Sequence, residues 1–233
     1  MSLAKKNSAE EGSVLVRDIL RNLQKDFRVE FRSRFAVNIA VSFAGIVTIS
    51  ISLTAGGAPF PVKVQSILLW VVLFFSAMNG LAHIFVREED QGTSLFLRIT
   101  RSADSIYISK FIFNQIFMMI IGTVVTPLFV FFVGVDVIHV LHFIMSVIAG
   151  GFSIAASTTP LAAMAAKAGG KGSLFTIISF PILLPVLWIS ISSTAGALNE
   201  ARPESGTVIF LLAFSGFITA ISILLFRFIW LEN

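Results

Sequence analysis

Residues 111–133 read FIFNQIFMMIIGTVVTPLFVFFV and contain no Asp, Glu, Lys or Arg. A helix of about 20 apolar residues crosses the hydrocarbon core of a bilayer, which is about 30 Å thick. A charged side chain at the bilayer centre costs at least about 2.5 kcal/mol, so a charge-free run of this length is typical of a membrane span. Five further runs share this character, over residues 36–55, 65–85, 137–166, 173–197 and 206–226. We therefore predict an all-α polytopic membrane protein with six transmembrane helices.

The lysines and arginines outside these runs are unevenly distributed. All but two of the 17 fall in the N-terminal segment, the loop 87–110, the turn 167–171 and the C-terminal segment. The opposite side carries Lys63 and Arg202. Because basic residues are enriched on the cytoplasmic side of a membrane, we expect both termini to lie in the cytoplasm. We place the chain in the bacterial inner (cytoplasmic) membrane as a multi-pass protein.

The overall composition supports a membrane protein and excludes several other classes. Hydrophobic residues make up 56% of the chain, which exceeds the share in a typical soluble domain. The net charge of +4 is explained by a basic rim that faces anionic membrane lipids, so we expect no nucleic-acid partner. The chain has no cysteine, which excludes disulfides and cysteine-ligated metals.

The chain divides into a short tail and one membrane domain. We expect residues 1–13 to form a disordered cytoplasmic tail and residues 14–233 to form a single transmembrane permease domain. Within residues 14–35, basic residues alternate with apolar residues at every third or fourth position, namely Val16, Leu20, Leu23, Phe27, Phe31 and Phe35. This pattern predicts an amphipathic helix that lies in the membrane interface. The alternative is a cytoplasmic helix that packs on a partner protein.

The fourth predicted span carries a stripe of small residues. They recur at every fourth position, at Gly151, Ala155, Thr159 and Ala163. Small residues allow helix backbones to approach closely inside a membrane. We therefore predict helix packing along this stripe, either within the subunit or across a homodimer.

Prolines are predicted to disturb two of the spans. Pro160 should kink the cytoplasmic end of the fourth span. Pro181 and Pro185 should break the fifth span and leave its outer half irregular or re-entrant. Such backbone is tolerated at membrane depth only where protein or water satisfies its polar groups.

The patterns that would support catalysis or cofactor binding are incomplete. Residues 169–173 read GGKGS, which lacks both the first glycine of a phosphate-binding loop and a Ser or Thr directly after the lysine. His139 and His142 lie too close on one helix to bind opposite axial positions of one iron, and a metal site generally needs more ligands. We expect them to form hydrogen bonds at headgroup depth. We predict no enzymatic activity in this chain, no catalytic residue, no cofactor and no metal site.

The loop 87–110 is the most informative polar segment. It begins with the acidic residues Glu88, Glu89 and Asp90, which favour a helix N-terminus. Leu95, Phe96 and Ile99 then form an apolar patch, and Ser102 or Asp104 is predicted to cap the helix that continues into the third span. An exposed apolar patch in a charged inner loop indicates docking on a partner, whereas the alternative is a solvated loop.

At this segment the chain resembles the heme exporter protein B (CcmB) family, the permeases of cytochrome c maturation. The resemblance rests on the acidic cluster followed by Gly92 and Thr93, and on the Ser-Ala-Asp-Ser helix start at 102–105, where the family often has Ser-Pro. It continues in Lys110 with Phe111 and Asn114, and in the two prolines of the fifth span. The chain length, six spans and cytoplasmic termini also match.

The resemblance implies an ABC-2-like permease fold that forms a homodimer and is driven by a separate cytoplasmic ATP-binding subunit. The loop 87–110 would then supply the coupling helix that meets the ATPase, with the contact residues Glu88, Glu89, Asp90, Gly92, Leu95, Phe96 and Ile99. It also implies a heme-handling membrane subunit, and ATP hydrolysis that releases a heme-loaded periplasmic chaperone. The alternatives are an ABC-2 permease for a lipid, glycan or drug, and a membrane scaffold that does not transport.

Overall fold

The computed structural model describes residues 2–81, 102–167 and 172–231. Within these ranges the chain forms seven α-helices and no strand. The helices are α1 (Ser2–Ser33), α2 (Phe35–Ala55), α3 (Val62–Leu81), α6 (Ala103–Val133), α7 (Val140–Lys167), α8 (Gly172–Leu198) and α9 (Ser205–Leu231).

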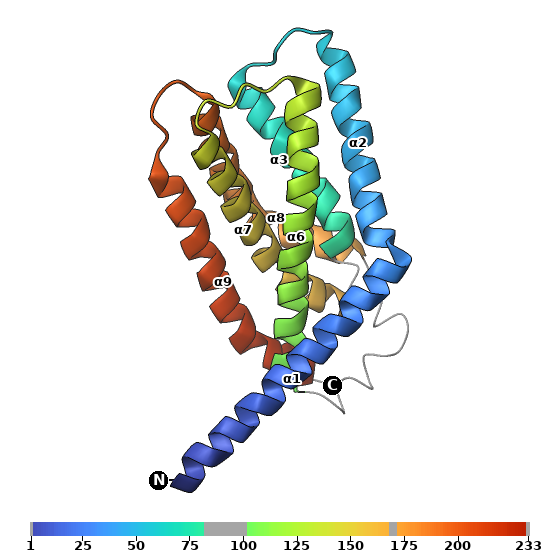
Figure 1. The fold of residues 1–233 in the computed structure, drawn as a ribbon, viewed down its shortest axis with the longest axis vertical. Helices are drawn as coiled ribbons and strands as arrows, with labels where there is room; N and C mark the ends of the chain where they lie inside the picture. Colours follow the sequence, from blue (N-terminus) through green and yellow to red (C-terminus); the bar gives the residue numbers. More distant parts are fainter. Residues whose placement is uncertain (1, 82–101, 168–171, 232–233) are drawn as a thin grey trace.

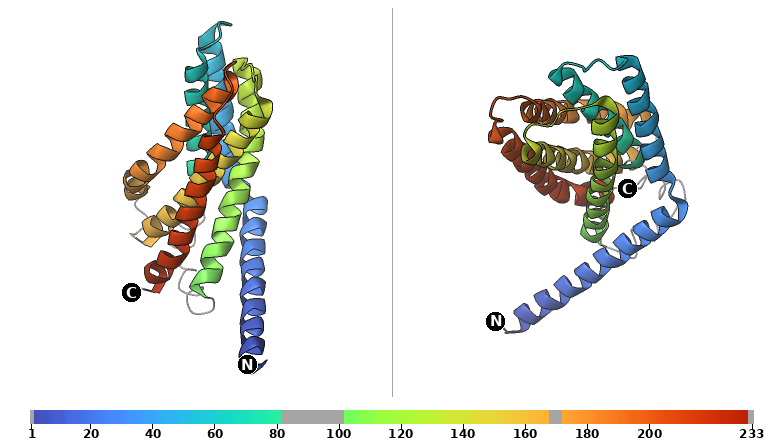
Figure 2. Two further views of the ribbon diagram at one scale, coloured as in Figure 1. Left: turned by 90° about the vertical axis from the view of Figure 1, so that its left-hand side faces the viewer. Right: turned by 45° about the horizontal axis from the view of Figure 1, so that its top comes forward.

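The helices form a bundle around α6, which contacts α1, α2, α3, α7 and α9 (Figure 1). On one flank α2 pairs with α3, and on the other α7 packs against both α8 and α9. The connections α2–α3, α6–α7 and α8–α9 gather at one end of the bundle, and both termini lie toward the other end (Figures 1 and 2). The arrangement agrees with two termini on one side of a membrane, and the cytoplasmic identity of that side stays a prediction.

Among the residues that the structure describes, five helices are long and apolar enough to cross a membrane. Their candidate spans are Phe35–Ala55, Ala103–Val133, Val140–Met164, Pro181–Leu198 and Ser205–Phe226. In α3, the described apolar part is the shorter Val62–Met78. The chain is therefore a polytopic helical membrane protein. The count of six spans stays a prediction, because the predicted span 65–85 extends beyond the described residues.

The first helix differs from the expectation of a disordered tail at residues 1–13. In the structure α1 begins at Ser2 and continues without interruption to Ser33. Lysine, alanine and glutamate, which dominate residues 4–11, are strong helix formers, so the polar tail extends the amphipathic helix instead of fraying. The helix crosses the terminal end of the bundle, and its N-terminus projects beyond it (Figure 1).

A single residue separates α1 from α2. Arg34 adopts the left-handed conformation, with φ 52° and ψ 17°, which turns the chain between the two helices. The Glu30 carboxylate completes this corner, because its Oε1 accepts hydrogen bonds from the backbone N–H groups of Ala36 at 2.9 Å and Val37 at 3.3 Å. These donors are among the N–H groups that lack partners inside a helix at its N-terminus, so Glu30 stabilises the start of α2.

The prediction that prolines break the fifth span is wrong. Pro181 and Pro185 both lie inside α8, which is a continuous helix over Gly172–Leu198. Pro160 likewise lies inside α7 without ending it, and α6 contains Pro127. A proline removes one backbone donor, and neighbouring helices and local adjustments compensate for that loss in membrane helices. Proline content alone therefore does not locate a break in this chain.

Helices α3, α7 and α8 make a close contact in the interior of the bundle. The indole of Trp70 is fully buried, and its Nε1 donates a hydrogen bond of 2.8 Å to Thr194 Oγ1. Gly150 faces this ring so closely that an added methyl group would overlap Trp70 and lie 2.6 Å from Ser190 Oγ. Glycine at 150 thus permits the approach of α7 to both neighbouring helices.

Candidate functional site

The predicted coupling segment lies mostly outside the described residues. This applies to Glu88, Glu89, Asp90, Gly92, Leu95, Phe96 and Ile99. The structure does describe the point where the loop ends. Ser102 caps α6, because its Oγ accepts a hydrogen bond of 3.3 Å from the N–H of Ser105, and Asp104 lies in the first turn. The predicted helix start is confirmed, with Ser102 as the cap.

A buried charge pair joins α1 to the start of α6. Asp26 Oδ2 lies 3.8 Å from Lys110 Nζ, and both side chains are almost completely buried. Lys25 Nζ lies 3.3 Å from the other oxygen of the same carboxylate. Because a charge removed from water is costly unless it is paired, these groups restrict how α1 can sit on α6. The sequence did not reveal this pair, although Asn22, Asp26 and Glu30 form a polar row at four-residue spacing.

The amphipathic helix divides its apolar face between the bundle and its surroundings. Leu23 and Phe27 pack against the core, and the Phe27 ring lies 5.0 Å from the ring of Phe113 in α6. Leu20 and Phe31 remain 59% and 67% exposed. The helix is thus attached to the transmembrane bundle along one side. Its exposed apolar side chains are compatible with the predicted location in the membrane interface, which stays a prediction.

Two residues of the α7 stripe, Gly151 and Thr159, contact α6 of the same chain. A methyl group on Gly151 would lie 3.0 Å from Met119 Cε and 3.4 Å from Met118 Cγ. Further along the stripe, Asn114 Nδ2 of α6 donates a hydrogen bond of 3.0 Å to Thr159 Oγ1. The side chains of Ala155 and Ala163 are buried.

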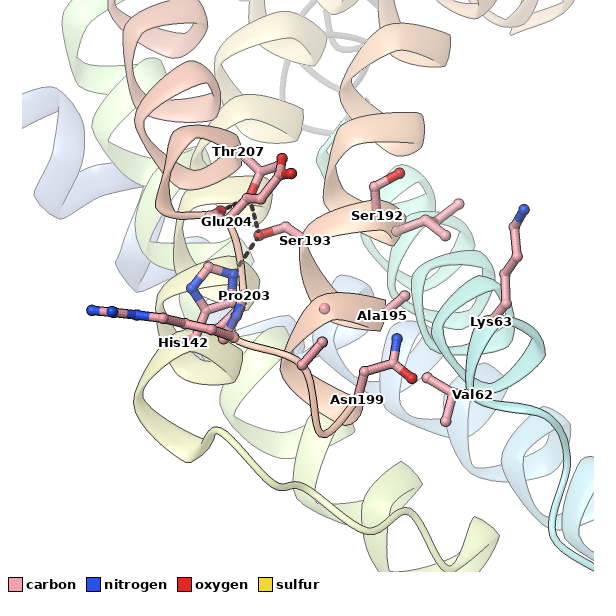
Figure 3. A pocket seen from close by; sticks show the side chains of 14 residues that line it. Val62, Lys63, His142, Ser192, Ser193, Ala195, Asn199, Pro203, Glu204 and Thr207 are labelled. Carbon is pink, nitrogen blue, oxygen red and sulfur yellow. Dashed lines mark hydrogen bonds between the residues drawn. The ribbon is translucent and has the colours of Figure 1, made fainter.

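A polar pocket opens at the loop end of the bundle, where α3, α7, α8 and α9 meet (Figure 3). Its volume is about 480 Å³. Lys63 and Arg202, which the charge analysis places on the outer side, both line it, together with His142 and Glu204. In Figure 3, Lys63 and His142 lie on opposite sides of α8. Sequence reasoning did not find this pocket, because its walls come from four segments far apart in the chain.

The floor of this pocket is a hydroxyl cluster centred on Ser193. The Oγ of Ser193 is 3.2 Å from His142 Nε2 and 2.7 Å from Ser146 Oγ, and it accepts a hydrogen bond of 2.8 Å from Thr207 Oγ1. These contacts join α7, α8 and α9 through the buried hydroxyls of Ser146 and Ser193 and the half-buried side chains of His142 and Thr207. The N–H of His139 donates to the carbonyl of Ala197 at 2.9 Å. Both histidines therefore lie at the contact between α7 and α8.

The described residues offer no metal centre. Among those that the structure places, no group of three or more His, Asp or Glu side chains is arranged to hold a metal ion. The pocket instead presents hydroxyl groups, an amide and charged side chains of both signs. Such a lining can bind polar or charged groups by hydrogen bonds and ion pairs.

Taken together, these features define a polytopic helical membrane protein with a polar pocket at one end and an attached amphipathic helix at the other. The sequence profile described as CcmB protein matches residues 17–229. The chain belongs to the CcmB family, the heme exporter permeases of cytochrome c maturation. As a permease subunit it is not itself an enzyme. No curated protein matches the chain.

Proposed function

We propose that this chain is the membrane subunit of an ABC-type complex for cytochrome c maturation, and that a separate cytoplasmic ATPase drives it. The observation that supports this most strongly is the family match, which extends over residues 17–229. The sequence has no complete phosphate-binding loop, so ATP hydrolysis requires another subunit. The excess of basic residues on one side supports an orientation with both termini in the bacterial cytoplasm.

The coupling element in this proposal is the loop that precedes α6. Its apolar residues Leu95, Phe96 and Ile99 dock on the ATPase, and Glu88, Glu89, Asp90 and Gly92 shape the start of the coupling helix. The loop leads directly into the Ser102 cap, and Lys110 lies two turns further along α6. Because Lys110 pairs with Asp26, a displacement of the loop would act on both α6 and α1. Close packing along the α7 stripe would help to move α6 and α7 as one unit.

The complex proposed here contains further subunits. A second copy of the chain completes the permease, and a heme-handling membrane subunit presents heme to the periplasmic chaperone. ATP hydrolysis then serves to release the chaperone in its heme-loaded form. In this division of labour the chain transmits motion and a partner handles heme.

The test is purification of the chain from its own membrane in a mild detergent. The proposal expects an ATPase with phosphate-binding motifs to co-purify in equal number with the chain, and ATP hydrolysis by that complex. A chain that purifies with redox or maturation proteins but without any ATPase would support the scaffold alternative. A third outcome is possible, in which the chain co-purifies with an ATPase but deletion of its gene leaves the c-type cytochromes intact. That outcome would support a permease for another cargo.

A further inference from the structure

A second cavity lies at the elbow between α1 and α2, against the side of α6. Its volume is about 370 Å³. In Figure 1 this elbow is where α1 meets α2 beside the lower part of α6, at the end of the bundle that holds the termini. The cavity is separate from the polar pocket, which opens at the opposite end.

One wall of the elbow cavity is apolar and largely aromatic. Phe27 of α1 and Phe113, Phe117 and Ile120 of α6 line it. Phe113 and Phe117 are buried and their rings stack at 6.2 Å, whereas Ile120 is 36% exposed. The wall thus starts in the packed interior and ends at the bundle surface, along α6 in the direction of the membrane interior. The exposed apolar surface of the cavity belongs to Ile120 and to Phe31 of α1, which also lines it and is 67% exposed. A hydrocarbon chain that lies in the cavity would cover this surface.

The mouth of the cavity is polar and carries a cation. Arg34 and Asn38 line it, and both side chains are exposed. Glu30 also lines it, but this carboxylate is buried and accepts two backbone hydrogen bonds from the start of α2. Within the part of the chain that the structure describes, no ion pair involves Arg34. The guanidinium is therefore available to an anion from outside the chain, and its five donors suit a phosphate group.

We propose that the elbow cavity binds one anionic phospholipid. The phosphate is held by the Arg34 guanidinium and the Asn38 amide, and an acyl chain lies along Phe117 and Ile120. The arrangement of polar and apolar residues matches that of a lipid. The polar mouth lies where the amphipathic helix ends, at the level of a headgroup, and the apolar wall follows a membrane span, at the level of an acyl chain. A free phosphate ion would satisfy Arg34 and leave the aromatic wall unused. This inference does not depend on the proposed transport role.

Occupation of this cavity has a structural consequence. Phe27, which lines it, is adjacent to Asp26, and Asp26 pairs with Lys110. A bound lipid fills space between the elbow and α6, so it supports the same α1–α6 contact as the buried charge pair. Membrane composition would in this way influence how firmly α1 is held against α6.

The test is native mass spectrometry of the full chain in a neutral detergent, titrated separately with phosphatidylglycerol and with phosphatidylcholine. The proposal expects a single lipid adduct that forms at lower concentration with phosphatidylglycerol. Arg34→Gln should raise the phosphatidylglycerol concentration at half-saturation about fivefold, the effect of one basic side chain on an anionic lipid. Arg34→Lys should retain the preference. Arg28→Gln removes an equal charge from an exposed part of α1 outside the cavity and should leave the titration unchanged.

The apolar wall has its own matched pair. Ile120→Trp should fill the cavity and weaken the adducts of both lipids, whereas Ile116→Trp places the same bulk one turn away, outside the cavity and at similar exposure. Equal binding of the two lipids by the unchanged chain would overturn the proposal, as would equal losses for Arg28→Gln and Arg34→Gln. An unaltered adduct in Ile120→Trp would also overturn it. Displacement of phosphatidylglycerol by inorganic phosphate would show a phosphate site instead.

Discussion

At the scale of single residues, close contacts between helices set strict limits on side-chain size. Gly150 and Gly151 are neighbours in α7, but their surroundings differ. An added methyl group at 150 meets the rigid, fully buried ring of Trp70, whereas at 151 the nearest atom is the flexible end of Met119. The same substitution should therefore have different effects at adjacent positions.

We expect Gly150→Ala to lower the free energy of unfolding by about 1–3 kcal/mol more than Gly151→Ala, the typical cost of overpacking. Both substitutions change intrinsic helix propensity equally, so the comparison isolates the contact with Trp70. Thermal or denaturant unfolding of both variants in the same detergent measures the difference. Equal stability of the two variants would contradict the described contact.

The pair formed by Asp26 and Lys110 provides a second test. Lys110→Met leaves the half-exposed Lys25 beside the buried Asp26 carboxylate. The loss of stability should therefore approach but not exceed that of a fully unpaired buried charge, about 3–5 kcal/mol. The double change Asp26→Asn with Lys110→Met removes both charges and should recover most of that loss. Unfolding measurements on the two single variants and the double variant form the required cycle. A double variant as unstable as the sum of the single variants would show that the two charges do not interact.

The two histidines at the loop end are expected to be structural. His142 Nε2 forms a hydrogen bond with Ser193 Oγ. The double change His139→Ala with His142→Ala removes this bond and should lower the free energy of unfolding by about 1 kcal/mol. Cytochrome c levels in a cell that depends on them should stay normal. Complete loss of c-type cytochromes, with the variant still assembled with its ATPase, would instead assign these residues to heme handling.

At the scale of helices, α6 connects the loop that precedes it to most of the bundle. The described structure begins again at Ser102, whose capping hydrogen bond and neighbouring Asp104 give α6 a defined first turn. From there α6 continues as one helix for 31 residues and contacts α1, α2, α3, α7 and α9. A force on the preceding loop would therefore reach most of the bundle through a single helix.

We expect Phe96→Asp to abolish stable association with the ATPase subunit. The change places an unpaired charge in an apolar contact, and such a charge is costly to bury. Phe96→Leu keeps an apolar side chain and serves as the control. Co-purification and ATPase activity are the readouts. Full association of Phe96→Asp would show that the predicted coupling patch does not contact the ATPase.

At the scale of the whole molecule, the sequence was informative where local patterns determine structure. Charge-free length predicted the membrane helices, and Ser102 predicted the start of α6. Proline was misleading in α8, which continues through Pro181 and Pro185. A membrane helix can tolerate a missing backbone donor when its neighbours satisfy the freed groups, and the local sequence does not show whether they do. The Asp26–Lys110 pair, the Ser193 cluster and both cavities join residues remote in the chain. Such contacts follow from helix packing, so single-sequence patterns do not reveal them.

The central claim is that this family member acts in cytochrome c maturation as the membrane subunit of an ATP-driven complex. Deletion of its gene, followed by quantification of covalently bound heme in c-type cytochromes, tests that claim most directly. We predict loss of c-type cytochromes with b-type cytochromes retained, restoration by the unchanged chain, and no restoration by Phe96→Asp. Normal levels of c-type cytochromes in the deletion strain would contradict the account.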